Sequence, residues 1–295
     1  MAADPAAHVP PPSPLRVHRA GGRRGWGGLW ADAQAIAREG RDGRFLAWRL
    51  FRRDLKAEFL RSKLGWWWNL ADPLILAAVF VFLRGERVLS GLPLPIPYPV
   101  WVVLGMLSLQ AFLNAWTQPL RLLGRSRPLQ QQVPVTPATL LLSQALRIGF
   151  DAAFYLPVMG LTLWWTGTLN LPGVLAAAWL YALLVALGCG LGVLMAPLNA
   201  AAEDVGKAVR SLNRPLLFLC PTFWYLTPGE GTLGRLNALN PIGRLMDAMR
   251  IAAVGRLDAP GVAAAAAGGT VAIAALLAAA ALCFHRTVPV IVSRT

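Results

Sequence analysis

The chain has 295 residues, of which 56% are hydrophobic and 14% are charged, and its mean hydropathy is +0.51. Because a typical soluble domain carries roughly 25% charged residues, this composition excludes an ordinary soluble protein and indicates an all-α membrane protein. The formal net charge of +14 would also suit a nucleic acid, but thirteen of the 28 Lys and Arg residues precede residue 64, where the apolar runs begin. We therefore expect the charge to face a lipid bilayer, and we expect no nucleic-acid partner.

The first 43 residues are rich in Pro, Gly and Arg. They contain no apolar h-region, so we expect no secretory signal peptide. A segment of this composition has too little apolar surface to fold by itself. We therefore predict a disordered, basic, cytoplasmic tail over residues 1–43.

Residues 44–63 read RFLAWRLFRRDLKAEFLRSK and have the pattern of an amphipathic helix. Apolar side chains recur at spacings of three and four residues, which places them on one helical face: Trp48, Phe51, Leu55 and Phe59. Basic residues crowd the remainder: Arg49, Arg52, Arg53 and Lys56. Such a helix beside a membrane span lies in the interface plane near anionic headgroups. Two interpretations stay open, simple membrane anchoring and a docking surface for a cytoplasmic partner.

Three consecutive tryptophans follow, in the stretch KLGWWWNLADP at residues 63–73. A helix that began at Pro73 would contain only about eleven apolar residues, too few to cross a membrane. We therefore place Trp66, Trp67 and Trp68 in the first span or at its shoulder. They are expected to act as interface anchors, because the amphipathic Trp ring favours the membrane–water boundary.

Six stretches approach the length of about 20 apolar residues that a transmembrane helix needs. The fifth is short and is interrupted by Pro221. We expect a six-helix transmembrane domain over residues 64–284 and a C-terminal tail over 285–295. The positive-inside rule places both termini in the cytoplasm. The six predicted spans cover about residues 64–83, 98–116, 140–166, 172–197, 214–228 and 260–284.

The segment between the fifth and sixth spans contains a second amphipathic pattern. Asn240 before Pro241 is a favourable helix start, with Asn as the N-cap and Pro at the first helical position. The apolar residues that follow fall on one face: Ile242, Leu245, Met246 and Met249. The charged residues fall largely elsewhere: Arg244, Asp247 and Arg250. We expect a short re-entrant or interfacial helix at the outer surface, and an ordinary loop with one helical turn is the alternative.

The third span contains an ionisable pair, Arg147 and Asp151, four residues apart and therefore on one helical face. Ionisable residues inside a span are costly and usually face a bundle interior or water. Either the pair holds helices together, or it lines a translocation path near its cytoplasmic side.

Aromatic residues cluster at the span ends, where most are explained as interface anchors. A minority could instead stack against sugar rings in a conduit, because flat apolar sugar faces suit aromatic planes. We name three as candidates for the path: Trp116, Trp224 and Tyr225.

Small residues in the fourth span give a packing signal. Gly188 and Gly192 have the GxxxG spacing that lets helix backbones approach closely. The three cysteines, Cys189, Cys220 and Cys283, each stand alone in an apolar run, so we expect no metal site.

Motifs for catalysis are missing from the chain. It has no phosphate-binding GxxxxGK[ST] loop and no HExxH or GxSxG motif. We therefore expect no enzyme activity and no cofactor in this chain. If transport occurs, its energy enters from another chain.

The order of several segments resembles the ABC type-2 permeases that export polysaccharides, the group of O-antigen, capsule and teichoic acid exporters. The first segment, WRLFRRDLKAEFLRSKLGWWWNLADPL, matches at Arg53, Asp54, Leu55, Leu64, Gly65, Trp68 and Pro73. Three further segments are similar to the second span, the inner loop with its following span, and the outer Leu-Asn-Pro segment of that family: YPVWVVLGMLSLQAFLNA, LNAAAEDVGKAVRSLNRPLLFLCPTFW and LNPIGRLMDAMRIAAVG. The sequence departs from the family at Asp72, where many relatives carry a neutral residue.

The resemblance implies a homodimer of twelve spans with two copies of a separate ATP-binding subunit, which would hold ATP and Mg. It implies a polyprenyl-diphosphate-linked glycan as the cargo and the cell inner membrane as the location. The ATP-binding subunit would dock on the cytoplasmic side at Arg52, Arg53, Asp54, Arg125, Arg127, Glu203 and Asp204.

Two other functions remain open from the sequence. One is a type-2 ABC permease for a drug, a lipid or another small molecule. The other is a membrane scaffold that transports nothing and binds no ATPase.

Overall fold

The computed structural model describes residues 26–61, 65–88, 94, 96–130, 135–224, 231–259 and 261–292. Some side chains in these ranges, including those of Trp66 and Arg127, lie outside the description, as does Tyr225. All regular secondary structure in the described ranges is helical. The all-α prediction is therefore confirmed for this part of the chain.

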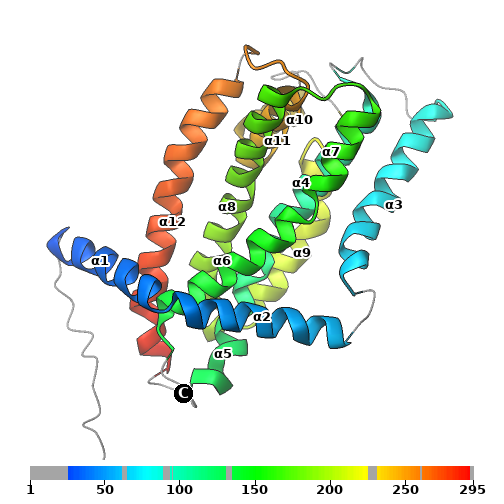
Figure 1. The fold of residues 1–295 in the computed structure, drawn as a ribbon. Helices are drawn as coiled ribbons and strands as arrows, with labels where there is room; N and C mark the ends of the chain where they lie inside the picture. The colour runs from blue at the N-terminus through cyan, green and yellow to red at the C-terminus, as the bar shows by residue number, and fades with distance from the viewer. Residues whose placement is uncertain are drawn as a thin grey trace, which may run out of the picture.

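Two helices, α1 (Trp26–Asp42) and α2 (Arg44–Arg61), lie across one end of a bundle of longer helices (Figure 1). The short helices η1 (Pro119–Arg121) and α5 (Leu122–Gln130) lie at that same end, which we call the α2 end. The opposite end holds α10 (Gly231–Leu239) and α11 (Pro241–Ala253), and we call it the α11 end. The bundle itself contains α3 (Gly65–Gly85), α4 (Tyr98–Thr117), α6 (Pro137–Ala153), α7 (Leu156–Trp165), α8 (Leu171–Ala201), α9 (Asp204–Leu219) and α12 (Val262–Val292).

Side-chain caps set the start of three helices. The side chains of Thr136, Asn170 and Asn240 accept hydrogen bonds from backbone N–H groups of α6, α8 and α11, and each of these helices has a proline in its first turn. This is the expected chemistry of a helix N-terminus. The N-cap predicted at Asn240 is confirmed, with its Oδ1 3.0 Å from the Ile242 nitrogen.

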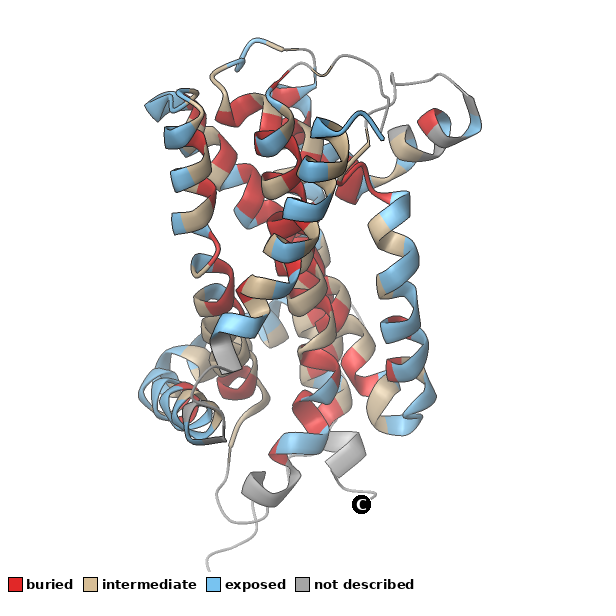
Figure 2. Ribbon diagram, turned by 90° about the vertical axis from the view of Figure 1, so that its right-hand side faces the viewer, coloured by how far each residue is buried: buried red, intermediate tan, exposed pale blue. Residues whose placement is uncertain are grey.

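The centre of the bundle is α8, which contacts α4, α11 and α12. Its glycines permit this, because a Cβ atom at Gly188 or Gly192 would overlap the backbone carbonyl of Phe112 or Trp116 on α4. The close approach predicted from the GxxxG spacing is therefore present. Figure 2 shows the buried residues gathered in the middle of the bundle, with exposed positions on its outer faces.

Within the described residues, five segments are long and apolar enough to cross a membrane: Trp67–Gly85, Tyr98–Ser126, Pro137–Trp165, Leu171–Ala201 and Val262–Val288. They correspond to the predicted spans one, two, three, four and six. The predicted fifth span, 214–228, instead contains the second half of α9 and a turn over residues 220–224, and its last four residues lie outside the described ranges. Six spans therefore stay a prediction.

The third segment is two helices instead of one. Helix α6 ends at Ala153 and α7 begins at Leu156. The reason is Pro157, which cannot donate to the carbonyl of Ala153 and whose ring would clash with it. The break places Phe154 and Tyr155 at a bend in the middle of the span.

Residues 26–42 differ from the predicted disordered tail, because they form α1. The prediction used the average composition of residues 1–43, which is rich in Pro, Gly and Arg. It did not take account of the local run WADAQAIARE, whose residues favour a helix. Two side-chain contacts tie α1 to α12: Asp32 pairs with Arg286 at 2.6 Å, and Glu39 is hydrogen-bonded to His285 at 3.3 Å. The segment predicted as a C-terminal tail, 285–295, is helical as far as Val292 and supplies both of these partners.

Candidate functional site

A polar network occupies the α2 end of the bundle, centred on Arg147 of α6. Its Nε donates to Asp151 at 3.1 Å, and its Nη2 donates to Glu58 of α2. The side chains of Arg147 and Asp151 are only 16% and 7% exposed. The pairing predicted from the spacing of these two residues is therefore confirmed. Glu58 could not be found from the sequence pattern, because it lies 89 positions away from Arg147 along the chain.

Two glutamine side chains, Gln118 directly after α4 and Gln144 on α6, extend the network from Asp151. The Gln118 amide donates to Asp151 at 2.6 Å, and the Gln144 amide donates to the side-chain carbonyl of Gln118 at 3.2 Å. The carboxylate of Asp151 thus accepts from both α6 and the end of α4. Buried polar groups of this kind are costly unless bonded, so the network fixes how α2, α4 and α6 sit together.

A second part of the network involves Tyr155 at the bend between α6 and α7. Asn114 of α4 donates to the Tyr155 hydroxyl at 3.0 Å, and this hydroxyl donates to the backbone carbonyl of Asn69 at 3.4 Å. Since Asn69 belongs to α3, the polar contacts reach from α2 to the first span.

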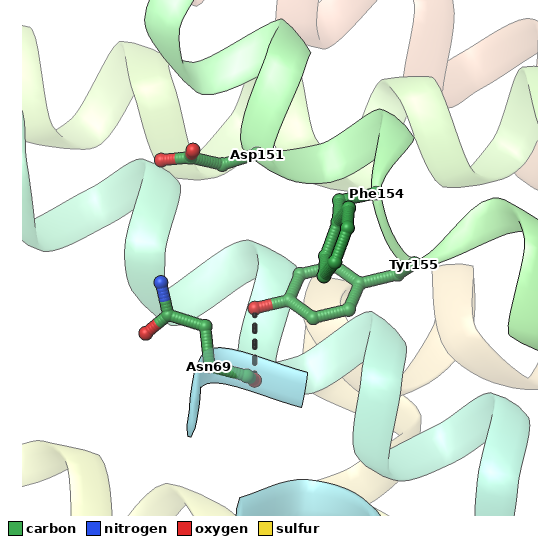
Figure 3. A pocket seen from close by; sticks show the side chains of 4 residues that line it. All are labelled: Asn69, Asp151, Phe154 and Tyr155. Atoms are coloured by element: carbon green, nitrogen blue, oxygen red, sulfur yellow. Dashed lines mark hydrogen bonds between the residues drawn. The ribbon is translucent and has the colours of Figure 1, made fainter. Parts of the chain in front are cut away.

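Residues of this network surround a small pocket that is partly open to the outside. It is lined by Asn69, Asp151, Phe154 and Tyr155, and Figure 3 shows the carboxylate, the amide and the hydroxyl of these residues together with the Phe154 ring. Trp67 packs edge-on against Phe154, with ring centroids 6.0 Å apart. The lining can bond water or hydroxyl groups on one side and contact an apolar face on the other.

The charge of the network limits what it can bind. One guanidinium is shared between two carboxylates, so Arg147 is already neutralised in this arrangement. An anionic group would have to displace Glu58 or Asp151 from it. The site therefore favours hydroxyl-rich or neutral groups over phosphates.

The other aromatic candidates for the path lie elsewhere. Trp116 is 9% exposed and packs against Phe112 in the core between α4 and α8, away from the pocket. Trp224 donates to the backbone carbonyl of Phe218 at 3.0 Å, in the turn after α9 at the α11 end. Tyr225 lies outside the described residues. The described members of the set, Trp116 and Trp224, are not brought together with Arg147 and Asp151.

Six of the residues assigned to docking have described side chains, and all six are exposed at the α2 end. Arg52, Arg53 and Asp54 are exposed on α2, where Arg53 pairs with Asp54 at 2.8 Å. Arg125 is exposed on α5. Glu203 and Asp204 are exposed where α9 begins. The amide of Asn199 beside them donates to the Leu120 carbonyl at 2.7 Å, which joins this corner to η1. The side chain of Arg127 lies outside the description.

At the tryptophan triplet, α3 begins at Gly65 and continues past Pro73, as predicted. The side chains of Trp67 and Trp68 are 60% and 57% exposed. Exposed indoles at the end of an apolar helix suit an interface anchor.

The residues at the α11 end divide into two environments. Pro241 and Arg244 are exposed, whereas Arg250 is completely buried. The amphipathic pattern predicted that Arg250 would lie off the apolar face. The structure differs because α11 packs on α8, α4 and α12 and is buried along most of its length, so little of it lies on a surface.

Within the described residues, no group of three or more His, Cys, Asp and Glu side chains is placed to hold a metal ion. The chemistry that the described site offers is hydrogen bonding and charge pairing inside an apolar bundle.

The helices and this buried network define a multi-pass membrane protein. No family model matches the chain. It is similar to the Escherichia coli polysialic acid transport protein KpsM, with 23% identity over 172 residues, and to a second KpsM protein from the same species, with 24% identity over 176 residues. Each match covers 58% of this chain, and the chain spans 66% of the length of each relative.

Proposed function

We propose that the chain is the membrane subunit of an ABC exporter that moves a lipid-linked polysaccharide across the cytoplasmic membrane. The observation that carries this proposal is the similarity to two polysialic acid transport proteins. The five apolar segments of the bundle and the segment order described above support it. In this proposal ATP and Mg are bound by a separate subunit, and this chain transports without hydrolysing ATP.

The α2 end faces the cytoplasm in this proposal. Exposed charged residues on α2, α5 and the start of α9 would form the docking surface for two copies of the ATP-binding subunit, with a second copy of this chain beside the first. The exposed apolar side chains of α3 include Ile75, Val79 and Phe82, and they are available to lipid or to that second copy.

The polar network would connect the docking surface to the bundle. Glu58 belongs to α2, which an ATP-binding subunit would contact, and its partner Arg147 holds Asp151 inside the third apolar segment. A displacement of α2 would therefore act directly on the bonds that join α6 to α4. The pocket beside Asp151 would meet sugar hydroxyls and not the diphosphate of the cargo, since Arg147 is already paired.

Two alternatives remain distinguishable by experiment. The purified chain should bind an ATP-binding-cassette protein encoded near it, and in vesicles this complex should hydrolyse ATP faster with polyprenyl-diphosphate-linked oligosaccharides than with the bare carrier lipid. Stimulation by small hydrophobic molecules instead would favour a type-2 permease for a drug or lipid. Failure to bind any ATP-binding-cassette protein would favour the scaffold.

A further inference from the structure

Arg250 of α11 is 0% exposed, yet it carries a charged group. Its Nη1 donates to the backbone carbonyl of Pro221 at 2.5 Å, and its Nη2 donates to the carbonyl of Thr222 at 3.0 Å. Nη1 also lies 3.2 Å from Asp247, one turn earlier on the same helix. Burial lowers the pKa of Arg250 to about 10 while Asp247 opposes this effect, so the side chain is a cation at neutral pH.

Helix α4 is shaped to receive this guanidinium. The Trp101 ring lies beneath it, with the Arg250 Cζ atom 4.1 Å from the ring centroid, a cation–π contact. One turn further along, Gly105 leaves the space that the guanidinium fills, since a Cβ atom there would overlap Nη2 of Arg250. The two positions on α4 thus accommodate one residue of α11.

The two carbonyls belong to the turn 220–224, which follows the last residue of α9. This turn also contacts two other helices: the Tyr98 hydroxyl of α4 donates to the Phe223 carbonyl at 3.1 Å, and the Phe223 ring stacks on Phe80 of α3 with centroids 4.2 Å apart. In contrast, only Gly206 and Val209 are buried along α9 itself. The helix is therefore held at the α11 end mainly through this turn.

The guanidinium is well suited to hold the turn in one arrangement. A cation at the C-terminal end of a helix complements its exposed carbonyls, and hydrogen bonds to a charged group are about twice as strong as those between neutral groups. Because a buried charge without partners is costly, the turn cannot leave Arg250 without another group or water replacing its carbonyls. The planar fork of Arg reaches both carbonyls at once, which a Lys ammonium does less well.

We propose that Arg250 is a positioning residue that holds the turn 220–224 in place through its bonds to the carbonyls of Pro221 and Thr222, a set of contacts that we call the clasp. When these contacts break, the α11 end of α9 can move away from α4 and α11. The clasp itself is argued from the contacts alone. Its role in transport, as the step that opens this end of the bundle for the cargo, rests on the proposed function.

Cys220 is a native reporter of this clasp. It lies in the turn, is 0% exposed, and burial raises the pKa of its thiol to about 11. With Cys189 and Cys283 replaced by Ala, a membrane-impermeant maleimide applied to both membrane faces should label Cys220 slowly. Arg250→Lys should raise the labelling rate about tenfold, because the loss of one charge-assisted bond shifts the opening equilibrium by about that factor.

Gly105→Ala provides a second variant that keeps Arg250. The added methyl group displaces the guanidinium, so labelling of Cys220 should rise here too. Arg244→Lys is the matched control, because Arg244 is exposed on the same helix, and it should leave the rate unchanged. If Arg250→Lys and Gly105→Ala elute as folded protein and Cys220 labels at the parent rate in both, the clasp is excluded.

The role in transport has its own readout. In vesicles that contain the ATP-binding partner and a polyprenyl-diphosphate-linked oligosaccharide, labelling of Cys220 in the parent chain should rise during ATP hydrolysis. An unchanged rate while ATP hydrolysis is stimulated overturns the opening step but leaves the proposed function intact. Absence of any stimulation counts against the proposed function, whereas the labelling of the isolated chain still decides the clasp.

Discussion

Two arginines are withdrawn from solvent at opposite ends of the bundle, and they are neutralised in different ways. Arg147, at the α2 end, lies between the carboxylates of Glu58 and Asp151. Arg250, at the α11 end, is bonded to two backbone carbonyls and one carboxylate and lies over an aromatic ring. The carboxylate partners of Arg147 belong to two helices, so its hydrogen bonds can change when these helices move. The carbonyl partners of Arg250 belong to one turn, so its hydrogen bonds fix the conformation of that turn.

Arg250→Met should have the largest effect on stability. The substitution leaves two buried carbonyls without donors and removes the cation from Asp247, and we expect a loss of about 4 kcal/mol in the free energy of unfolding. Denaturant titration of the purified chain in detergent measures this loss. Arg244→Met on the exposed face of α11 should change it by less than about 0.5 kcal/mol. Equal losses in the two variants would contradict the importance of the buried contacts.

Arg147→Met should cost somewhat less, about 3 kcal/mol, because one of the two stranded carboxylates is accessible to water. The Glu58 side chain is 37% exposed, whereas Asp151 is 7% exposed. The exposed Arg125→Met is the matched control at the same end. A loss as large as that of Arg250→Met would show that exposure of Glu58 does not relieve the unpaired charge.

A double-mutant cycle should separate the two partners of Arg147. We expect Glu58→Gln alone to lower the free energy of unfolding by about 1 kcal/mol and Asp151→Asn to lower it by more. The loss in the double variant should differ from the sum of the two single losses by about 0.5–1 kcal/mol, because both carboxylates share one guanidinium.

Exchange of the two charges on α6 tests the same contact in another way. The double variant Arg147→Asp with Asp151→Arg should not regain the stability of the parent chain, since it puts a second carboxylate beside Glu58. Full recovery in that exchange would show that Glu58 does not contribute.

The smallest effect should be a pH dependence at the α11 end. Burial raises the pKa of Asp247 from 3.8 to about 6, although Arg250 opposes the rise. The folded chain then holds a proton more tightly than the unfolded chain, so the free energy of unfolding should fall as the pH rises through this range and level off above it. Asp247→Asn should flatten this part of the profile, and the exposed Asp258→Asn should not. If the free energy of unfolding of the parent chain rises with pH over the same interval, the raised pKa of Asp247 is contradicted.

Local patterns predicted much of the helical framework. The spacing of Arg147 and Asp151, the Asn240–Pro241 start and the GxxxG pair each depend on contacts within one helix or on backbone shape, and each is present. The bend at Phe154 and Tyr155 could have been predicted from Pro157. The tail over 1–43 was predicted from its average composition, which obscured the helix that begins at Trp26.

Contacts between distant segments could not be predicted in this way. Glu58 is an ordinary residue of a charged helix until α2 is placed against α6. Arg250 has Asp247 one turn earlier on its own helix, but its other two partners are backbone carbonyls of a distant turn, which carry no sequence signal. The Gly105 position was the available clue, since a glycine inside an apolar helix often marks a close approach, but it does not identify the group that approaches.

Movement of a glycan across a membrane, driven by ATP hydrolysis, is the activity that the proposed function requires. The chain and its ATP-binding partner would be reconstituted into vesicles that carry a polyprenyl-diphosphate-linked oligosaccharide, with an impermeant lectin present only on the side opposite the ATP. We expect the oligosaccharide to become accessible to the lectin when ATP is added, and to stay inaccessible with a non-hydrolysable ATP analogue. Accessibility that does not change on ATP addition, in vesicles where the complex hydrolyses ATP, would contradict the proposed function.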